Sequence, residues 1–192
     1  MTPFLVIAAA LVLFTAAAAY CDWRTGQIPN RLIVVGLAVA VPLHAAARWF
    51  TLRALSKDAG AELTFGLVSC AVGLLVCALA PLLLFRFKGI GGGDVKLLAT
   101  VGAFAGPLVG MEIQFYSALL LLFFVAARLV YSGELVKTLR NSVALLQNPF
   151  LPHARRRALP EQLMARLPFA PSVFATALLL SSAQLLTIAI RP

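Results

Sequence analysis

Residues Leu63 to Phe85, LTFGLVSCAVGLLVCALAPLLLF, decide the fold class of this chain, because no charged side chain interrupts them. At about 1.5 Å per residue, a helix of this length crosses the hydrocarbon core of a membrane, which is about 30 Å thick. The rest of the chain has the same character, since 61% of its 192 residues are hydrophobic and 12% are charged. A typical soluble domain has about 25% charged residues. The composition therefore excludes an ordinary soluble domain.

Apolar stretches of about 17 residues or more, the length that a spanning helix needs, recur along the whole chain. They lie at roughly 3–20, 31–47, 63–85, 95–110, 113–131 and 171–190. Gly102, Gly106, Pro107 and Gly110 weaken the fourth, which Glu112 separates from the fifth. Alternating segments of about ten residues, typical of a membrane barrel, are absent from the sequence. We predict an all-α polytopic membrane protein, a bundle of about six transmembrane helices forming one domain over residues 1–192.

The basic residues predict the orientation, because Lys and Arg favour the cytoplasmic side of short loops. With six spans, four basic residues fall on one face: Arg48, Arg53, Lys57 and Arg191. Twelve fall on or close to the other: Arg24, Arg31, Arg86, Lys88, Lys96, Arg128, Lys137, Arg140, Arg155, Arg156, Arg157 and Arg166. This asymmetry places the first, third and fifth loops in the cytoplasm and both termini outside.

The long segment 132–168 is predicted to be a basic cytoplasmic loop that contains an amphipathic helix. Leu135, Leu139, Val143 and Leu146 recur at helical spacing, as in a helix lying in the membrane interface. The run Arg155 to Arg157 favours contact with anionic lipid, and a substrate-docking surface is the alternative. The net charge of +9 is interpreted in the same way, as topology and lipid contact, so we expect no nucleic-acid partner.

Metal and cofactor chemistry find no support in the sequence. The three cysteines form no CxxC pair, and Cys70 and Cys77 fit small apolar positions of one helix. His44 and His153 lie far apart, on segments predicted to be on opposite sides. We expect neither a metal nor an organic cofactor.

Two acids stand where apolar stretches end or begin. Asp22 opens a short loop that Pro29 and Asn30 close, and Asp94 follows the triple glycine Gly91-Gly92-Gly93. Ionisable groups at the edge of the hydrocarbon are costly, which favours a function for them. Both fall on the face predicted to be cytoplasmic. Two neighbouring carboxyls share one proton, so one acid can activate water while the other protonates a peptide carbonyl.

The glycines before Asp94 lack Cβ atoms, so an extended peptide could lie against Gly91, Gly92 and Gly93. Lys96 could attract an acidic residue of that peptide or a lipid headgroup. A phosphate loop is a poor alternative, because the GxxxxGK[ST] spacing is missing and membrane helices flank the glycines. Each aspartate taken singly also fits a helix cap or a topology charge.

The motifs are similar to those of a known family. Gly91-Gly92-Gly93-Asp94 matches the GxGD signature of membrane aspartyl proteases. The wider run from Gly89 to Leu98 resembles the type IV prepilin leader peptidases, as does Asp22 followed by Ile28-Pro29-Asn30. The resemblance covers residues 3 to about 110. Pro168-Phe169-Ala170-Pro171 is similar to the family's Pro-Phe-Gly-Pro segment, and Ala170 in place of Gly puts the tightness of packing there in doubt.

The resemblance implies a membrane aspartic endopeptidase of the bacterial inner membrane, with Asp22 and Asp94 as its catalytic residues. It would cut the basic leader from a prepilin or pseudopilin, after a Gly at the cytoplasmic boundary. The methyltransferase region with paired CxxC motifs is missing, which implies a short form similar to the prepilin peptidases of Flp (Tad) pilus systems.

Two other functions remain open at this stage. The chain could be a small proton-coupled transporter with the two acids as a relay, or an inactive scaffold of a pilus or secretion machine. The sequence does not reveal which prepilin would be cut or the oligomeric state.

Overall fold

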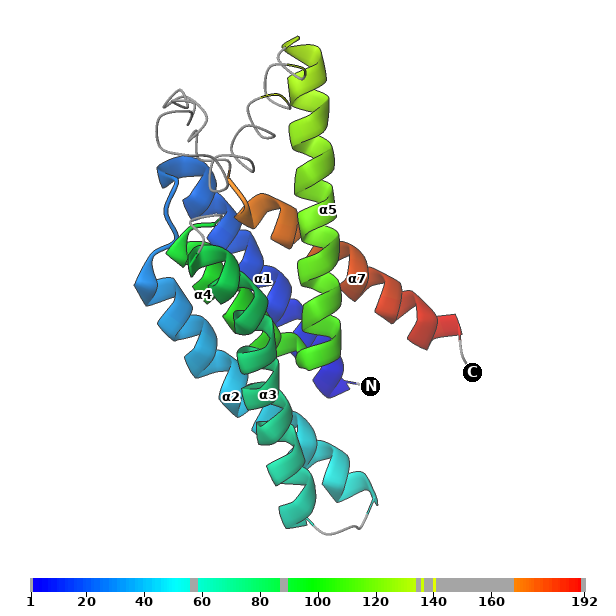
Figure 1. Ribbon diagram of the computed structural model, residues 1–192. Coiled ribbons are helices and arrows are strands. Elements are labelled where there is room, and N and C mark those ends of the chain that lie inside the picture. The colour runs from blue at the N-terminus through cyan, green and yellow to red at the C-terminus, as the bar shows by residue number, and fades with distance from the viewer. Residues whose placement is uncertain are drawn as a thin grey trace. The chain divides into compact units, whose positions relative to one another are not determined.

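A computed structural model of the chain describes residues 2–55, 59–86, 90–133, 136, 140 and 168–190. Regular structure within these residues is helical throughout, which confirms the all-α prediction (Figure 1). The helices are α1 (Thr2–Thr25), α2 (Asn30–Leu55), α3 (Ala59–Arg86), α4 (Gly92–Ala105), α5 (Pro107–Tyr131) and α7 (Ala170–Ile190).

Four of these helices contain segments long and apolar enough to cross a membrane, as judged over the described residues. The segments are Leu5–Thr25, Asn30–Ala47, Gly66–Arg86 and Pro107–Tyr131, and α7 adds the shorter apolar segment Ala170–Ala183. Helix α4 has 14 residues, so it is about 21 Å long at 1.5 Å per residue. It is too short to cross the core of about 30 Å, and the predicted fourth span at 95–110 is wrong in length.

The break between α4 and α5 explains this error. Gly106 has a φ of 78°, a conformation that favours glycine, and its amide donates to the carbonyl of Gly102 at 2.9 Å. Pro107 then begins α5, where its missing N–H and fixed φ fit the first position of a helix. Residues 107–112 therefore belong to α5, which begins well before the predicted position 113.

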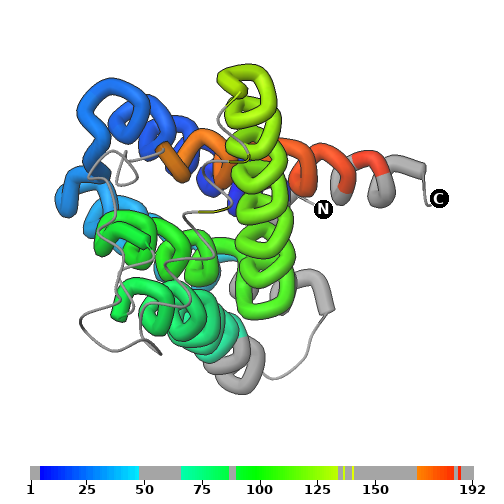
Figure 2. Tube along the Cα trace, turned by 45° about the horizontal axis from the view of Figure 1, so that its top comes forward, coloured from blue at the N-terminus to red at the C-terminus, as the bar shows by residue number. Residues whose placement is uncertain are grey.

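Residues 1–118 and 168–192 form one compact unit. Within it α3 lies along α4 and α1 lies along α7, and α2 contacts α1, α3 and α4 (Figure 2). Small residues allow the closest approach, as is common between helices in membranes. A Cβ on Gly73 of α3 would overlap the backbone of Gly102 of α4, and one on Gly110 would lie 2.7 Å from the sulfur of Cys77.

Helix α4 is the central element of this unit. Leu97, Val101 and Phe104 recur at helical spacing on it and are almost fully buried. The ring of Phe104 lies against that of Phe14 from α1, with centroids 5.6 Å apart. The interior is thus apolar around a short helix whose first turn carries Asp94.

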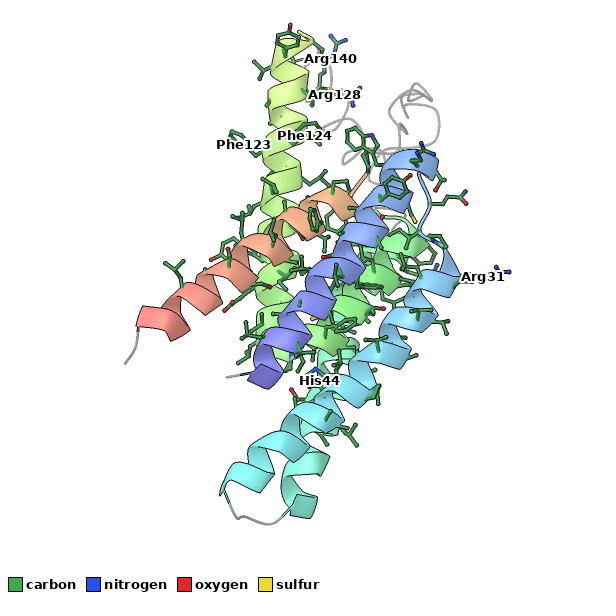
Figure 3. The ribbon with its side chains drawn as sticks, turned by 180° about the vertical axis from the view of Figure 1, so that it is seen from behind. Arg31, His44, Phe123, Phe124, Arg128 and Arg140 are labelled. Atoms are coloured by element: carbon green, nitrogen blue, oxygen red, sulfur yellow. The ribbon has the colours of Figure 1, made fainter. Side chains whose placement is uncertain are left out.

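Residues 119–167 form a second compact unit, of which the structure describes mainly the second half of α5. Phe123 and Phe124 project from this half-helix and are exposed, as lipid-facing residues would be (Figure 3). The predicted amphipathic helix and the run Arg155 to Arg157 in the segment 132–168 lie outside the described residues.

Candidate active site

Asp22 lies in the last full turn of α1, and its side chain is 7% exposed. The amide of Gly26 donates to the carbonyl of Asp22 at 2.8 Å, and Gly26 takes a φ of 63° that ends the helix. Residues 26–29 then connect α1 to α2. A short loop is present, but it begins at Gly26, so the prediction that Asp22 itself opens the loop is wrong: α1 continues for three residues beyond Asp22.

The Asp22 carboxylate binds the start of α7. Its Oδ2 accepts a hydrogen bond from the backbone amide of Ala170 at 3.1 Å. The first turn of a helix has amides without helical partners. Here Pro171 has no N–H, and the amides of Ser172 and Val173 donate to the carbonyl of Phe169. Asp22 thus satisfies the remaining amide of the turn, a contact that the sequence did not reveal.

Ala170 stands where the Pro-Phe-Gly-Pro pattern has a glycine, a difference that put tight packing of this turn in doubt. Its side chain is fully buried, so the extra methyl group is accommodated next to Asp22 and the turn packs tightly. The prolines that flank Phe169-Ala170 are a sequence signal for a helix start. That signal predicts free amides there, but not which acid binds them.

Asp94 occupies the third position of α4, with Gly91 as the N-cap. Its Oδ2 accepts a hydrogen bond from the amide of Gly91 at 3.3 Å, a local capping contact. Burial raises the pKa of Asp94, the negative charge of Asp22 raises this pKa further, and the Gly91 amide opposes both. Such a charge effect weakens with distance. The charge of Asp22 therefore reaches Asp94, and the joint catalytic role of the two acids stays a prediction.

The three glycines form the start of a helix. Gly91 is the N-cap, with an extended backbone, and Gly92 and Gly93 are the first two residues of α4. A Cβ on Gly92 would lie 3.4 Å from the ring of Phe85, and one on Gly93 would lie 3.6 Å from the Cβ of Ile28. Both are ordinary contact distances. Gly93 therefore sits against the loop that follows Asp22.

Lys96 is exposed, and it has a partner within the chain. Its Nζ donates a hydrogen bond to the side-chain oxygen of Asn30 at 2.8 Å. Asn30 is the first residue of α2. The substrate-binding role suggested for Lys96, and that suggested for Gly91, Gly92 and Gly93, stay predictions.

A separate polar contact involves His44 and the end of α4. The Nε2 of His44 lies 2.9 Å from the carbonyl oxygen of Phe104 and donates to it at the end of α4, and Figure 3 labels His44 on α2. A cavity of about 310 Å³ lies beside this contact, lined by Leu11, His44, Ser69, Phe104, Ile113 and Ser181 among others, but not by Asp22 or Asp94. Among the described residues, no three His, Cys, Asp or Glu side chains gather as metal ligands.

Comparison with known proteins points to one family. The model of the type IV leader peptidase family matches residues 9–126, a range that contains Asp22, the glycines and Asp94. The comparisons with curated proteins and with solved structures give no match.

Proposed function

Because the chain belongs to the type IV leader peptidase family, and is therefore a peptidase of the membrane, we propose that it is an aspartic endopeptidase. The observation that carries this proposal is the pairing of Asp22 and Asp94, in which the charge of one acid raises the pKa of the other. A raised pKa keeps Asp94 protonated to higher pH, next to the charge of Asp22. That is the state that aspartic proteolysis requires.

The environments of the two acids suggest how they divide the work. The Ala170 amide holds the Asp22 carboxylate, so Asp22 is the general base that takes a proton from water. The raised pKa of Asp94 makes it the acid that protonates the carbonyl oxygen of the scissile peptide. The hydroxide adds to the carbonyl carbon. As the C–N bond of this tetrahedral intermediate breaks, the amine takes the proton from Asp22 and one hydroxyl of the intermediate returns its proton to Asp94, which restores both acids.

We propose a prepilin-like substrate that carries a short basic leader and an apolar N-terminal helix. The leader would lie at the cytoplasmic face of the bacterial inner membrane, with its backbone close to Gly91 and Asp94. Cleavage after a Gly at this boundary agrees with the position of the acids at helix ends. Anionic lipid is the proposed partner of the basic segment 132–168.

The position of the acids also weighs against a proton-coupled transporter. A relay needs ionisable groups inside the spans, whereas Asp22 lies in the last turns of α1 and Asp94 in the first turn of α4. An inactive scaffold would keep the same fold without catalysis, so an activity measurement separates it from a peptidase.

The test is direct cleavage of a synthetic prepilin peptide with a basic leader, a Gly at the cleavage site and an apolar segment. Purified protein in detergent is incubated with the peptide, and the products are identified by mass spectrometry. We expect one cut after the Gly and none with Asp94→Asn. An intact peptide with the wild-type protein, over a set of such leaders, would contradict the proposed function.

A further inference from the structure

The hydrogen bond between Lys96 and Asn30 joins the two segments that carry the acids. Lys96 stands two residues after Asp94, and Asn30 stands eight residues after Asp22. Their side chains meet at 2.8 Å, although 66 residues separate them in the chain. The bond has an ammonium group as donor and an amide oxygen as acceptor, a charge-assisted pair that is stronger than a neutral one.

A second contact supports the same junction from the other side of Asp94. A Cβ on Gly93 would lie at ordinary contact distance from Ile28, 3.6 Å from its Cβ and 3.8 Å from its backbone nitrogen. Asp94 is therefore flanked by a residue that contacts Ile28 in the connection between α1 and α2, and by one that contacts Asn30 at the start of α2. The contact before it is apolar, and the contact after it is polar.

The connection itself is anchored at its start by local bonds. The hydroxyl of Thr25 lies 2.8 Å from the carbonyl of Cys21 and 3.0 Å from that of Gln27. At the other end, the amides of Leu32 and Ile33 donate to the carbonyl of Pro29, and the side chain of Asn30, the first residue of α2, contacts Lys96 of α4. One path from Asp22 to Asp94 thus runs through this short loop and the hydrogen bond between Asn30 and Lys96, which lies at the surface.

We propose that Asn30 and Lys96 are positioning residues, whose hydrogen bond holds the first turn of α4 against the segment after Asp22 and so sets the separation of the two carboxyls. This inference rests on the proposed function for its catalytic consequence. A displacement of about 1 Å in an active site can reduce a rate by about 100-fold. Loss of the bond should therefore lower kcat without weakening substrate binding.

The first test compares kcat and KM for the wild-type protein, Lys96→Met, Asn30→Ala and the double variant on the prepilin peptide. We expect each single variant to lower kcat by about 10- to 100-fold, with KM almost unchanged. The double variant should be no slower than either single variant, because both remove the same contact. Asn30→Asp, which keeps an acceptor oxygen, should retain most of the activity.

Arg31→Met is the matched control. Arg31 is exposed beside Asn30 and points away from the bundle (Figure 3), so its loss removes the same charge as Lys96→Met and leaves the bond intact. We expect its kcat to equal that of the wild-type protein. A rise in KM confined to Lys96→Met would overturn the proposal, because it would make Lys96 a substrate contact. Unchanged kcat in both single variants would overturn it as well.

A second readout does not depend on proteolysis. Hydrogen–deuterium exchange in the full-length protein should be faster at residues 26–32 and 90–95 in Lys96→Met and Asn30→Ala, and unchanged in Arg31→Met. If the wild-type protein cleaves no peptide, the proposed function fails and exchange decides the positioning role. Faster exchange in both variants supports that role, and exchange equal to that of the wild type overturns it.

Discussion

The Asp22 carboxylate accepts the amide hydrogen of Ala170, so this residue has a structural role at α7 besides its proposed role in catalysis. The two roles depend on different properties of the side chain. Catalysis needs an ionisable acid, whereas the amide needs only an acceptor oxygen. Substitutions can therefore separate them.

We predict that Asp22→Asn abolishes cleavage and keeps the stability of the wild-type protein, because the side-chain amide retains an oxygen for Ala170. Asp22→Ala should also be inactive, and it should be less stable than Asp22→Asn by about 1–3 kcal/mol, the cost of a buried amide left without a partner. Unfolding in mixed detergent measures the difference. Equal stability of the two variants would contradict the helix-capping role.

The environment of Asp94 predicts that the stability of the folded protein depends on pH. Burial and the charge of Asp22 raise its pKa in the folded protein. The protonated acid therefore stabilises the folded protein. This contribution is complete below the pKa of the unfolded state, about 4, and is lost as the pH rises through the pKa of the folded state. Asp94→Asn keeps an oxygen for the Gly91 amide but cannot ionise.

The melting temperature of Asp94→Asn, relative to that of the wild-type protein, should therefore rise between about pH 4 and neutral pH. Thermal unfolding in detergent at several pH values measures this difference, with Asp22→Asn as a second comparison. A difference that does not change with pH would mean that Asp94 ionises as it does in the unfolded chain.

At the scale of single residues, Asp22 and Asp94 are conspicuous in the sequence because each is a charge at the end of an apolar stretch, and their catalytic role stays a prediction. Their partners were not predictable in the same way. Asn30 meets Lys96 and Asp22 meets Ala170 across long intervals of the chain, and no local pattern specifies such pairs. The role of Ile28 beside Gly93 likewise depends on how α4 meets the loop.

At the scale of elements, α4 departs most from prediction. The hydropathy pattern predicted that this span continues to residue 110, because the residues around Gly106 are apolar. The helix ends at Ala105 instead, since Gly106 takes a positive φ and Pro107 starts a new helix. Those two residues were visible in the sequence, but their effect on the boundary depends on backbone geometry.

The short helix depends on glycines where it meets α3. We predict that Gly102→Ala lowers stability by about 1–3 kcal/mol, the usual cost of overpacking, because its Cβ would overlap the backbone of Gly73 and lie 2.6 Å from the Cβ of Cys77. Gly92→Ala is the matched control on the same helix, since its Cβ would have an ordinary contact with Phe85. Unfolding in mixed detergent compares the two variants. Equal stability would contradict the close packing of α3 on α4.

At the scale of the whole molecule, composition and apolar length were enough to predict an all-helical membrane protein. They placed each of the helices described, although the ends shifted. Composition and apolar length did not predict which helices contact each other, because any apolar helix can pack on any other. The second compact unit, residues 119–167, contains the predicted amphipathic helix, which stays a prediction.

One end of the first unit brings together the helix ends that border three loops. The end of α1, the start of α2, the end of α3 and the starts of α4 and α7 meet there, through Ile28, Phe85, Gly93 and Ala170. These are the boundaries of the first, third and fifth loops, which the basic residues assign to the cytoplasm. The cytoplasmic location of this end stays a prediction.

The central claim is that Asp22 and Asp94 act as one catalytic unit, and kcat/KM for four proteins on one prepilin peptide tests it most directly. The proteins are the wild type, Asp22→Asn, Asp94→Asn and the double variant, all in the same detergent. We predict that each single variant loses at least about 10⁴-fold, and that the double variant loses no more than either, because residues that act as a unit are not additive. Substantial cleavage by either single variant, or losses that add in the double variant, would contradict the paired mechanism.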